Sequence, residues 1–164
     1  MSIQVKKILC CVAMRPSSEV VLLRALHEAQ AHDAQVQVMH VIPSFDAAMA
    51  TPIMSFMGEE KFRKLAEEHK QETTALIRKE IEELNGRILR EHLEGSVDRI
   101  TDIHVYEGDP ELEILNMADH LKADMIVMGT HTKGPTQYTF MGSVARKVIK
   151  RARVPVLLVP PVGH

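Results

Sequence analysis

Residues 125–149, MIVMGTHTKGPTQYTFMGSVARKVI, form the stretch that decides the fold of this 164-residue chain. Residues 125–128 are a short apolar run of the kind that forms a strand buried on both faces. A polar loop follows Gly129, and a helical pattern begins after Gly142, with Ser143 as the predicted N-cap. Free backbone N–H groups and the positive end of the helix dipole converge at such a point. The stretch therefore predicts a phosphate-binding loop.

This loop differs from the two commonest phosphate loops. A Walker A loop has Gly-Lys-Ser/Thr at the helix start, whereas here Lys133 is followed by a glycine and a proline. The Gly-x-Gly-x-x-Gly turn of dinucleotide-binding proteins is absent from the stretch as well. The spacing instead resembles that of the universal stress protein family, whose ATP-binding members carry Gly-x2-Gly-x9-Gly-Ser/Thr after the fourth strand. Gly129, Gly142 and Ser143 match this motif, and Thr132 stands where its second glycine is expected.

Composition predicts one globular domain over residues 1–164. Hydrophobic residues make up 45% of the chain and charged residues 26%, which is ordinary for a globular protein. The formal net charge of −2 provides no electrostatic basis for binding nucleic acid or an anionic membrane. No apolar segment approaches the length of a membrane span. Cys10 and Cys11 are adjacent in a predicted strand and point to opposite faces, which argues against a disulfide between them. A cytoplasmic location is expected.

The rest of the chain alternates strands and helices. An apolar strand, a helical pattern and a second strand follow one another within about 35 residues, which predicts a βαβ unit. Asp109 as N-cap and Pro110 at the first helical position mark the start of a later helix. The predicted strands are 8–14, 36–42, 100–106, 125–128 and 154–159, and the predicted helices are 19–31, 59–85, 110–121 and the one that follows Gly142.

Two segments are less regular. Residues 43–58 are rich in methionine and have no clean period, so they predict an apolar loop. This loop is expected to pack on the domain or on a partner subunit, or to form a flexible lid over a ligand. Residues 59–85 predict a long charged helix with one narrow apolar stripe, and the pair Asn85-Gly86 predicts a kink or a stop. Apolar residues beyond this pair indicate another turn or two before Gly95.

The resemblance to the universal stress protein family extends over most of the chain. It includes His40-Val41 at the end of the second strand, Gly108-Asp109-Pro110, Ala123-Asp124 and the glycine loop, in this order. On these pieces the chain is identified as a member of the family. The resemblance implies an open five-stranded parallel sheet of order 3-2-1-4-5 with helices on both faces. This fold is Rossmann-like, of the adenine nucleotide α-hydrolase-like type. A ligand is then expected beyond the carboxyl ends of the strands, where the order reverses.

The same resemblance implies an adenine nucleotide as ligand, which is ATP, AMP or cyclic AMP, with Mg²⁺ held through the phosphates. Relatives that bind nucleotides usually have an aspartate where this chain has Ala13, and Thr132 adds a side chain where backbone is expected to approach phosphate. Arg15 and Thr132 are candidates to compensate, and binding weaker than in a relative with the full motif is expected. The implied binding residues are Val12, Ala13, Val41, Met128, Gly129, Thr130, His131, Thr132, Gly142, Ser143 and Val144.

Three functions stay open. The first is a stress-response regulatory protein that binds an adenine nucleotide without fast turnover. The second is a family member that has lost nucleotide binding and acts through contacts with a protein partner. The third is an enzyme of the wider fold group, although no paired acid and base stand near the loop, so at most slow ATP hydrolysis is expected. No dedicated metal site is expected, because the nine histidines form no His-x-x-x-His pair.

The last strand predicts a homodimer. Residues 154–159 are apolar on both faces, yet the implied order places them at the sheet edge. An exposed apolar edge favours pairing with another strand, and Pro155 near its start is tolerated only at an edge. The family resemblance implies antiparallel pairing across a two-fold axis. Basic residues near the end of the preceding helix, Lys147, Lys150, Arg151 and Arg153, are expected to complement its negative pole.

Overall fold

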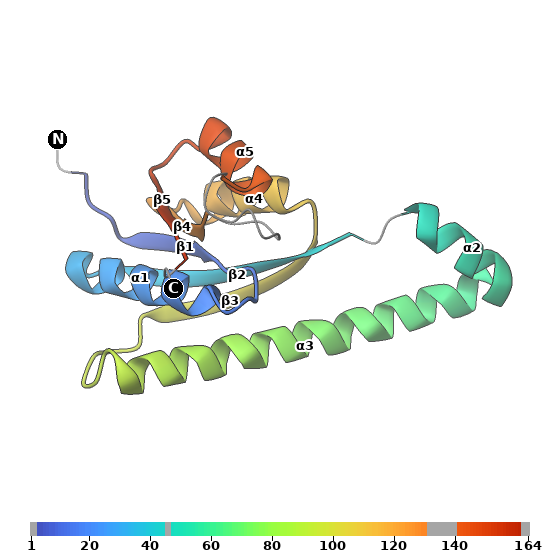
Figure 1. Cartoon of the computed structure of the whole chain (residues 1–164), viewed down its shortest axis with the longest axis horizontal. Helices are drawn as coiled ribbons and strands as arrows, with labels where there is room; N and C mark the ends of the chain where they lie inside the picture. Colours follow the sequence, from blue (N-terminus) through green and yellow to red (C-terminus); the bar gives the residue numbers. More distant parts are fainter. Residues whose placement is uncertain (1–2, 45–46, 131–140, 162–164) are drawn as a thin grey trace.

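Five strands form one parallel sheet in the computed structural model, which describes residues 3–44, 47–130 and 141–161 (Figure 1). Their order is β3-β2-β1-β4-β5, which confirms the predicted topology. Each of β1 and β4 is a short, mostly buried apolar run, as expected for central strands of a parallel sheet. The strands are β1 (Lys7–Cys11), β2 (Gln35–Pro43), β3 (Ile100–Gly108), β4 (Met125–Gly129) and β5 (Val156–Val159).

Helices cover both faces of this sheet (Figure 1). Helices α1 (Ser18–His32) and α3 (Glu59–Glu91) pack on one face, and α4 (Pro110–Leu121) and α5 (Ser143–Arg151) pack on the other. Each face has its own apolar cluster, because successive side chains of a strand point to opposite sides. Cys10 belongs to the first cluster and Cys11 packs against the second, which confirms the predicted opposite orientations. None of the helices in the described ranges has both the length and the apolar character that crossing a bilayer requires.

The starts of α4 and α5 differ in how closely they follow the local sequence signals. As predicted, Asp109 is the N-cap of α4, where its carboxylate oxygen Oδ1 accepts a hydrogen bond from the Leu112 N–H at 3.2 Å. The prediction of Ser143 as the N-cap of α5 is wrong, because Gly142 occupies that position and no side chain caps the helix. The Gly142 N–H donates to the Thr130 carbonyl at 2.7 Å, and this tertiary bond is consistent with a helix that begins one residue earlier than predicted.

Residues 43–58 are not the predicted loop, since they contain helix α2 (Ala47–Met57). Alanine and methionine favour a helix, although Pro52 removes one of its backbone hydrogen bonds. The helix carries no charged side chain, so the contrast between apolar and polar faces that reveals a helical period is missing. It packs on α3, and only Pro43 of the described residues in this segment lines the cavity discussed below. In this arrangement α2 is not a lid.

The prediction of a kink or stop at Asn85-Gly86 is also wrong, because α3 continues to Glu91. Asn85 is buried and donates from its side-chain amide to both carboxylate oxygens of Asp98 at 3.2 Å. One turn later Ile88 is fully buried against the sheet. Tertiary packing on both sides of the glycine therefore holds this part of the helix straight, and the extra turns indicated by the apolar residues do form.

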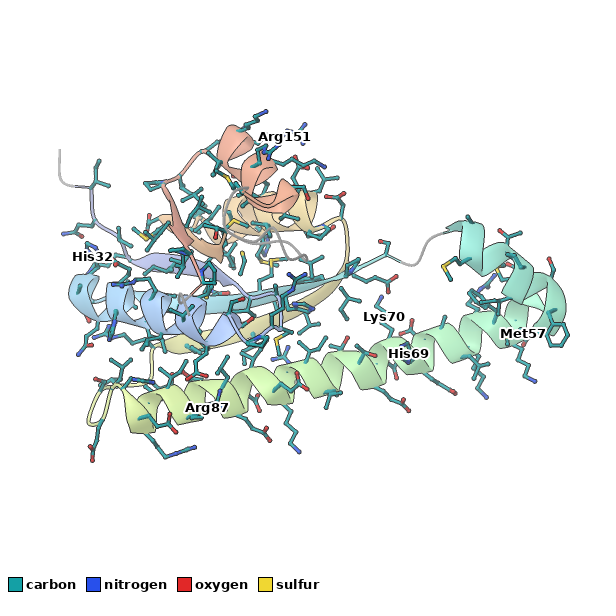
Figure 2. The ribbon with its side chains drawn as sticks, viewed as in Figure 1. His32, Met57, His69, Lys70, Arg87 and Arg151 are labelled. Carbon is teal, nitrogen blue, oxygen red and sulfur yellow. The ribbon has the colours of Figure 1, made fainter. Side chains whose placement is uncertain are left out.

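Only the second half of α3 packs on the sheet. Its first buried residue is Ile77, and the preceding residues together with α2 project away from the body (Figure 1). We call residues 47–76 the helical arm. Figure 2 shows its length, with Met57 near the turn between the two helices and His69 and Lys70 along the projecting part of α3. The arm is therefore a pair of helices that extends beyond the sheet and the other helices on it (Figure 1).

Gly86 lies inside α3 and Gly95 lies beyond its end, so the two glycines allow a test of whether the helix is regular at Gly86. We expect Gly86→Ala to raise the free energy of unfolding by about 0.5–1 kcal/mol, the difference in helix propensity. A Cβ there would lie 3.3 Å from Arg90 Nη1, the end of a flexible and exposed side chain. Equilibrium unfolding in urea measures the change.

Gly95→Ala is the matched control. Gly95 has a φ of 78°, a conformation that costs a side chain about 1–2 kcal/mol, so this variant is expected to lose stability. Loss of stability in Gly86→Ala of the same size as in Gly95→Ala would contradict a regular helix at Gly86.

Candidate functional site

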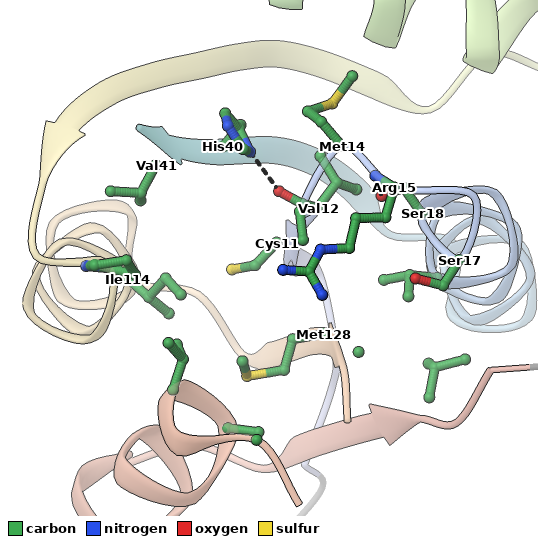
Figure 3. Close-up of a pocket in the computed structure, with 18 of the residues that line it drawn as sticks. Cys11, Val12, Met14, Arg15, Ser17, Ser18, His40, Val41, Ile114 and Met128 are labelled. Carbon is green, nitrogen blue, oxygen red and sulfur yellow. Dashed lines mark hydrogen bonds between the residues drawn. The ribbon is translucent and has the colours of Figure 1, made fainter. Parts of the chain in front are cut away.

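A cavity of about 570 Å³ opens at the carboxyl ends of the central strands (Figure 3). Its floor includes Cys11 and Met128, which are paired in register across β1 and β4, together with Met39 of β2. This is the point at which the strand order reverses, where open α/β sheets bind ligands. Its volume lies within the range of roughly 300–1,000 Å³ typical of small-molecule sites.

Three helix N-termini open on this cavity. In a parallel sheet every helix that follows a strand begins at the same edge, so the positive ends of the helix dipoles converge there. An anion at this edge is therefore favoured by several dipoles at once. The lining residues at these helix starts are Ser17 and Ser18 of α1, Pro110 and Ile114 of α4, and Gly142, Val144 and Ala145 of α5.

The start of α5 is tied directly to the end of β4. The Thr130 N–H donates to the Val159 carbonyl at 3.2 Å, and the Thr130 carbonyl accepts from Gly142 at 2.7 Å. These bonds bring Gly129 and Gly142 to one wall of the cavity, although the sequence separates them by a long loop. The first N–H groups of α5 have no acceptor within their own helix. The arrangement therefore provides backbone donors for an anion.

The cavity brings together most of the residues that the sequence assigned to the site. Ser143 begins α5 beside the cavity but is exposed and does not line it. His131 and Thr132 lie outside the described residues. The assigned residues that line the cavity are Val12, Ala13, Val41, Met128, Gly129, Thr130, Gly142 and Val144.

His40 is a cavity residue to which the sequence analysis gave no role. Its Nδ1 lies 2.8 Å from the Val12 carbonyl oxygen, so Nδ1 carries the hydrogen and donates. This bond ties β2 to the turn after β1. The turn itself contains Met14, whose φ of 53° lies in the left-handed region that side chains rarely adopt. No local pattern in the sequence distinguishes this histidine, because its partner is a backbone carbonyl in the turn that follows another strand.

Both thiols near the cavity are protonated at neutral pH. Burial raises the pKa of the Cys11 thiol to about 12. Burial also raises the pKa of Cys10 well above its ordinary value, and the neighbouring Cys11 adds to this shift. Since the thiolate is the nucleophilic form, neither cysteine is suited to covalent catalysis.

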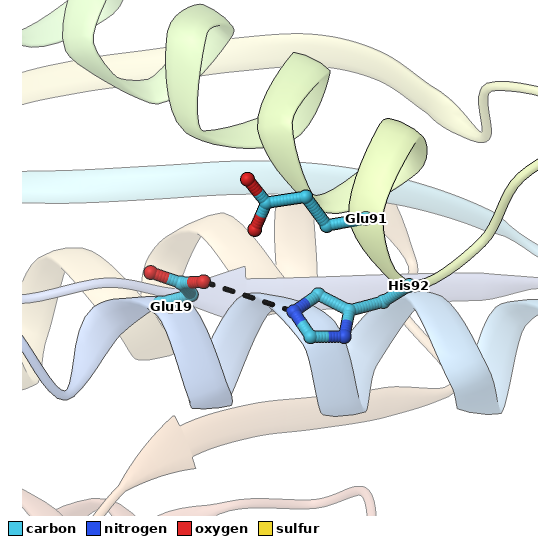
Figure 4. Close-up of side chains that lie close together, drawn as sticks. All are labelled: Glu19, Glu91 and His92. Atoms are coloured by element: carbon cyan, nitrogen blue, oxygen red, sulfur yellow. Dashed lines mark ion pairs between the residues drawn. The ribbon is translucent and has the colours of Figure 1, made fainter.

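A second group of titratable side chains joins α1 to α3. Glu19, Glu91 and His92 offer ligand atoms within 4.8 Å of one another, the one such group among the described residues (Figure 4). Glu19 Oε2 already pairs with Arg87 Nη2 at 2.7 Å, and Glu19 Oε1 lies 3.9 Å from His92 Nε2. Because a cation already neutralises Glu19, we interpret the group as an ionic contact between two helices.

The basic residues near the end of α5 have an acidic partner on α4. Glu111 is nearly buried, and its two oxygens lie 3.3 Å from Lys147 Nζ and 3.0 Å from Arg151 Nη1. Figure 2 shows Arg151 at the outer end of this helix pair. The contact fixes α5 against α4 and thereby holds the N-terminus of α5 at the cavity. These side chains thus have a structural role in addition to the predicted effect on the helix dipole.

The fold and the cavity define an open α/β protein with a ligand-sized site at the reversal of its strand order. The family model of the universal stress protein family matches residues 4–160. Universal stress protein MJ0531 of Methanocaldococcus jannaschii is 33% identical over 138 residues, which are 82% of this chain and 70% of the relative. The chain belongs to the universal stress protein family.

Two solved structures share the fold. The universal stress protein UspA from Lactobacillus plantarum has a TM-score of 0.67 at 17% identity, and the match covers 95% of this chain and 98% of that chain. A universal stress protein in complex with cAMP has a TM-score of 0.59 at 20% identity, and the match covers 96% and 98% of the two chains.

The protonated state of the thiols leads to a reactivity test. In the folded protein at pH 8 we expect iodoacetamide to modify Cys10 and Cys11 at least about tenfold more slowly than in the urea-unfolded chain, because little thiolate is present. Mass spectrometry over time measures both rates. A thiol in the folded protein that reacts as fast as in the unfolded chain would refute the raised pKa, and Cys11→Ser would show which cysteine is responsible.

Proposed function

We propose that this chain is a stress-response regulatory protein that binds an adenine nucleotide without fast turnover. The observation that carries the proposal is the cavity at the strand reversal, where three helix N-termini and the Gly129–Gly142 wall meet. A family member of the same fold has been solved in complex with cAMP, which supports a nucleotide as the ligand class. ATP, AMP and cyclic AMP are the proposed ligands, and the cytoplasm is the proposed location, since both cysteines are free thiols.

Each part of the nucleotide has a proposed contact. The apolar Val41 and Met128 suit an adenine ring, and Val12 and Ala13 lie where a nucleoside would pass. The phosphates are assigned to the start of α5, whose first N–H groups have no acceptor within their own helix, and to the end of β4 beside it. The proposed phosphate contacts are Gly129, Thr130, Gly142, Ser143 and Val144, with His131 and Thr132 on the same loop.

The residues around the cavity favour binding over catalysis. No aspartate or glutamate lines it within the described ranges, so that part of the chain supplies no carboxylate base for hydrolysis. The same residues supply no carboxylate for Mg²⁺, which proteins usually hold through one or two carboxylates in addition to phosphates. Magnesium is therefore proposed only as a companion of the phosphates, where it would neutralise part of their charge.

The helical arm favours a second candidate function, which is action through contacts with a protein partner. Helix α2 has no charged side chain, and Phe56 on it is 93% exposed. Met49 and Leu65 are other large apolar side chains exposed on the arm. Exposed apolar surface of this kind marks interaction sites more often than isolated apolar residues do. The two candidates are compatible, since the arm lies away from the cavity (Figure 1).

We also propose a homodimer built on β5. This strand is at the edge of the sheet, and it spans Val156–Val159 rather than the whole predicted range 154–159. Val156, Leu157 and Leu158 are only half-buried there. Pairing with the same strand of a second copy would cover these side chains and satisfy the edge N–H and carbonyl groups.

Replacement of a glycine in the cavity wall tests the nucleotide proposal. Gly142 has φ −57° and ψ 153°, which a valine adopts without strain. We therefore expect Gly142→Val to fold and to lose binding of ATP, AMP and cyclic AMP, since its branched side chain would occupy the space proposed for phosphate. Calorimetry measures binding, and Gly86→Ala serves as a glycine control outside the cavity. Absence of heat in the wild type at millimolar ligand would refute nucleotide binding and leave the protein-contact candidate.

The dimer is tested by the mass of the protein in solution. Light scattering at micromolar concentration is expected to give twice the chain mass of 18.4 kDa. Val156→Lys should shift the mass to that of the monomer by placing a charge on the paired edge, whereas the β-branched control Val156→Thr should keep the dimer. A monomeric wild type, or a Val156→Lys variant that associates unchanged, would contradict the interface.

A further inference from the structure

Arg15 is the ionic side chain of the cavity that the proposed function does not yet use. It lies in the turn between β1 and α1, and Figure 3 shows its side chain reaching into the cavity above Met128. Its backbone is held at both polar atoms: the Arg15 N–H donates to Ser18 Oγ at 3.0 Å, and the Arg15 carbonyl accepts from the Ser18 N–H at 2.8 Å. Ser18 is buried, so the base of the arginine side chain is fixed.

The charge of Arg15 has no carboxylate partner in the part of the chain that the structure describes. Other arginines do pair there, as Arg87 does with Glu19 and Arg151 with Glu111. Glu19 of α1 and two glutamates of α3, Glu80 and Glu83, line a separate, smaller hollow that Arg15 also borders, but its guanidinium is directed into the larger cavity (Figure 3). Residues 131–140, which separate β4 from α5 in the sequence, contain no aspartate or glutamate either.

The surroundings of Arg15 strengthen the effect of its charge. The cavity around it is lined largely by apolar side chains such as Val12, Val41 and Met128, and attraction between charges grows as water is excluded. The helix N-termini at the same edge add further positive potential to that of the Arg15 guanidinium. A guanidinium also presents a planar fork of N–H donors that matches two phosphate oxygens. The cavity is therefore suited to a ligand with more than one negative charge.

We propose that Arg15 determines the ligand class of this site by binding a phosphate group, so that the cavity selects nucleoside di- and triphosphates over cyclic monophosphates and uncharged nucleosides. This inference rests on the proposed nucleotide site and adds its charge selectivity. A cyclic phosphate diester carries a single negative charge on one phosphorus, so the electropositive wall attracts it less strongly than it attracts a di- or triphosphate. A longer phosphate chain can meet the α5 N-terminus and Arg15 at the same time.

The test compares four ligands at two salt concentrations in the wild type and in three variants. Arg15→Gln removes the charge at similar length, Arg15→Lys keeps the charge without the fork, and Arg24→Gln is the control on the exposed face of α1. Calorimetry is performed with ATP, ADP, cyclic AMP and adenosine at low and high salt. We expect Arg15→Gln to weaken ATP binding about ten- to a hundredfold, the value of a charge-assisted hydrogen bond. Adenosine binding should stay within about twofold, and Arg15→Lys should be intermediate.

Each outcome separates the inference from the proposed function. Equal loss of ATP and adenosine binding in Arg15→Gln, or unchanged ATP binding, would overturn charge selection while leaving the nucleotide site in place. Wild-type protein that binds none of the four ligands would refute the nucleotide proposal, and tripolyphosphate would then be the probe. Binding of tripolyphosphate that Arg15→Gln abolishes would retain Arg15 as the anion determinant, and no binding would overturn both. Thermal unfolding of each variant shows that its fold is intact.

Discussion

The structure depends on one geometric constraint, which is that β1 and β4 are neighbours whose following helices pack on opposite faces of the sheet. Helix α1 leaves β1 toward the face that carries α3, and α5 leaves β4 toward the face that carries α4. The chain therefore diverges at the carboxyl ends of two adjacent strands, and no connection crosses between them. The space left at this divergence is the cavity.

The chemical character of the cavity follows from the same constraint. Because all strands are parallel, α1, α4 and α5 all present their N-termini to this edge, and the edge is electropositive before any side chain is considered. The side chains then add Arg15 and, among the described lining residues, no acid. Two tertiary contacts keep the wall in place: the Gly142–Thr130 hydrogen bond joins α5 to β4, and Glu111 joins α4 to α5.

The helical arm is a separate structural element. From Ile77 onward α3 is bound to the sheet by fully or nearly buried isoleucines, and the Arg87–Glu19 ion pair adds a contact with α1. Before Ile77 the same helix is mostly exposed and packs on α2. A long helix can project in this way because its backbone hydrogen bonds are satisfied internally. The fold thus places apolar surface away from the cavity, at a distance set by the length of one helix.

The amino-acid sequence alone determined the approximate positions of the strands and of the glycine loop. These positions rest on local signals: buried apolar runs, the Asp109-Pro110 helix start and the spacing from Gly129 to Gly142. The sheet order was implied by the resemblance to the universal stress protein family and is confirmed by the structure. Periodicity also located α3, although it did not show that the helix would pass through Gly86. The family resemblance then allowed Val12, Ala13, Val41 and Met128 to be placed at one edge of the sheet, because parallel strands end there together.

Tertiary structure decided the features whose partners are distant in sequence. In the sequence Asn85 predicts a helix end, and only the folded structure places Asp98 beside it. His40 likewise has a role only in the folded structure, where the Val12 carbonyl lies within hydrogen-bonding distance. Helix α2 has no charged residue to reveal its period, so only its packing on α3 identifies it. The charge of the cavity also depends on tertiary structure. Arg15 is visible in the sequence, but only the folded chain shows that no carboxylate lines the cavity with it among the described residues. Hydrogen bonds and ion pairs act over a few ångströms in space, and sequence distance carries no information about that separation until the chain has folded.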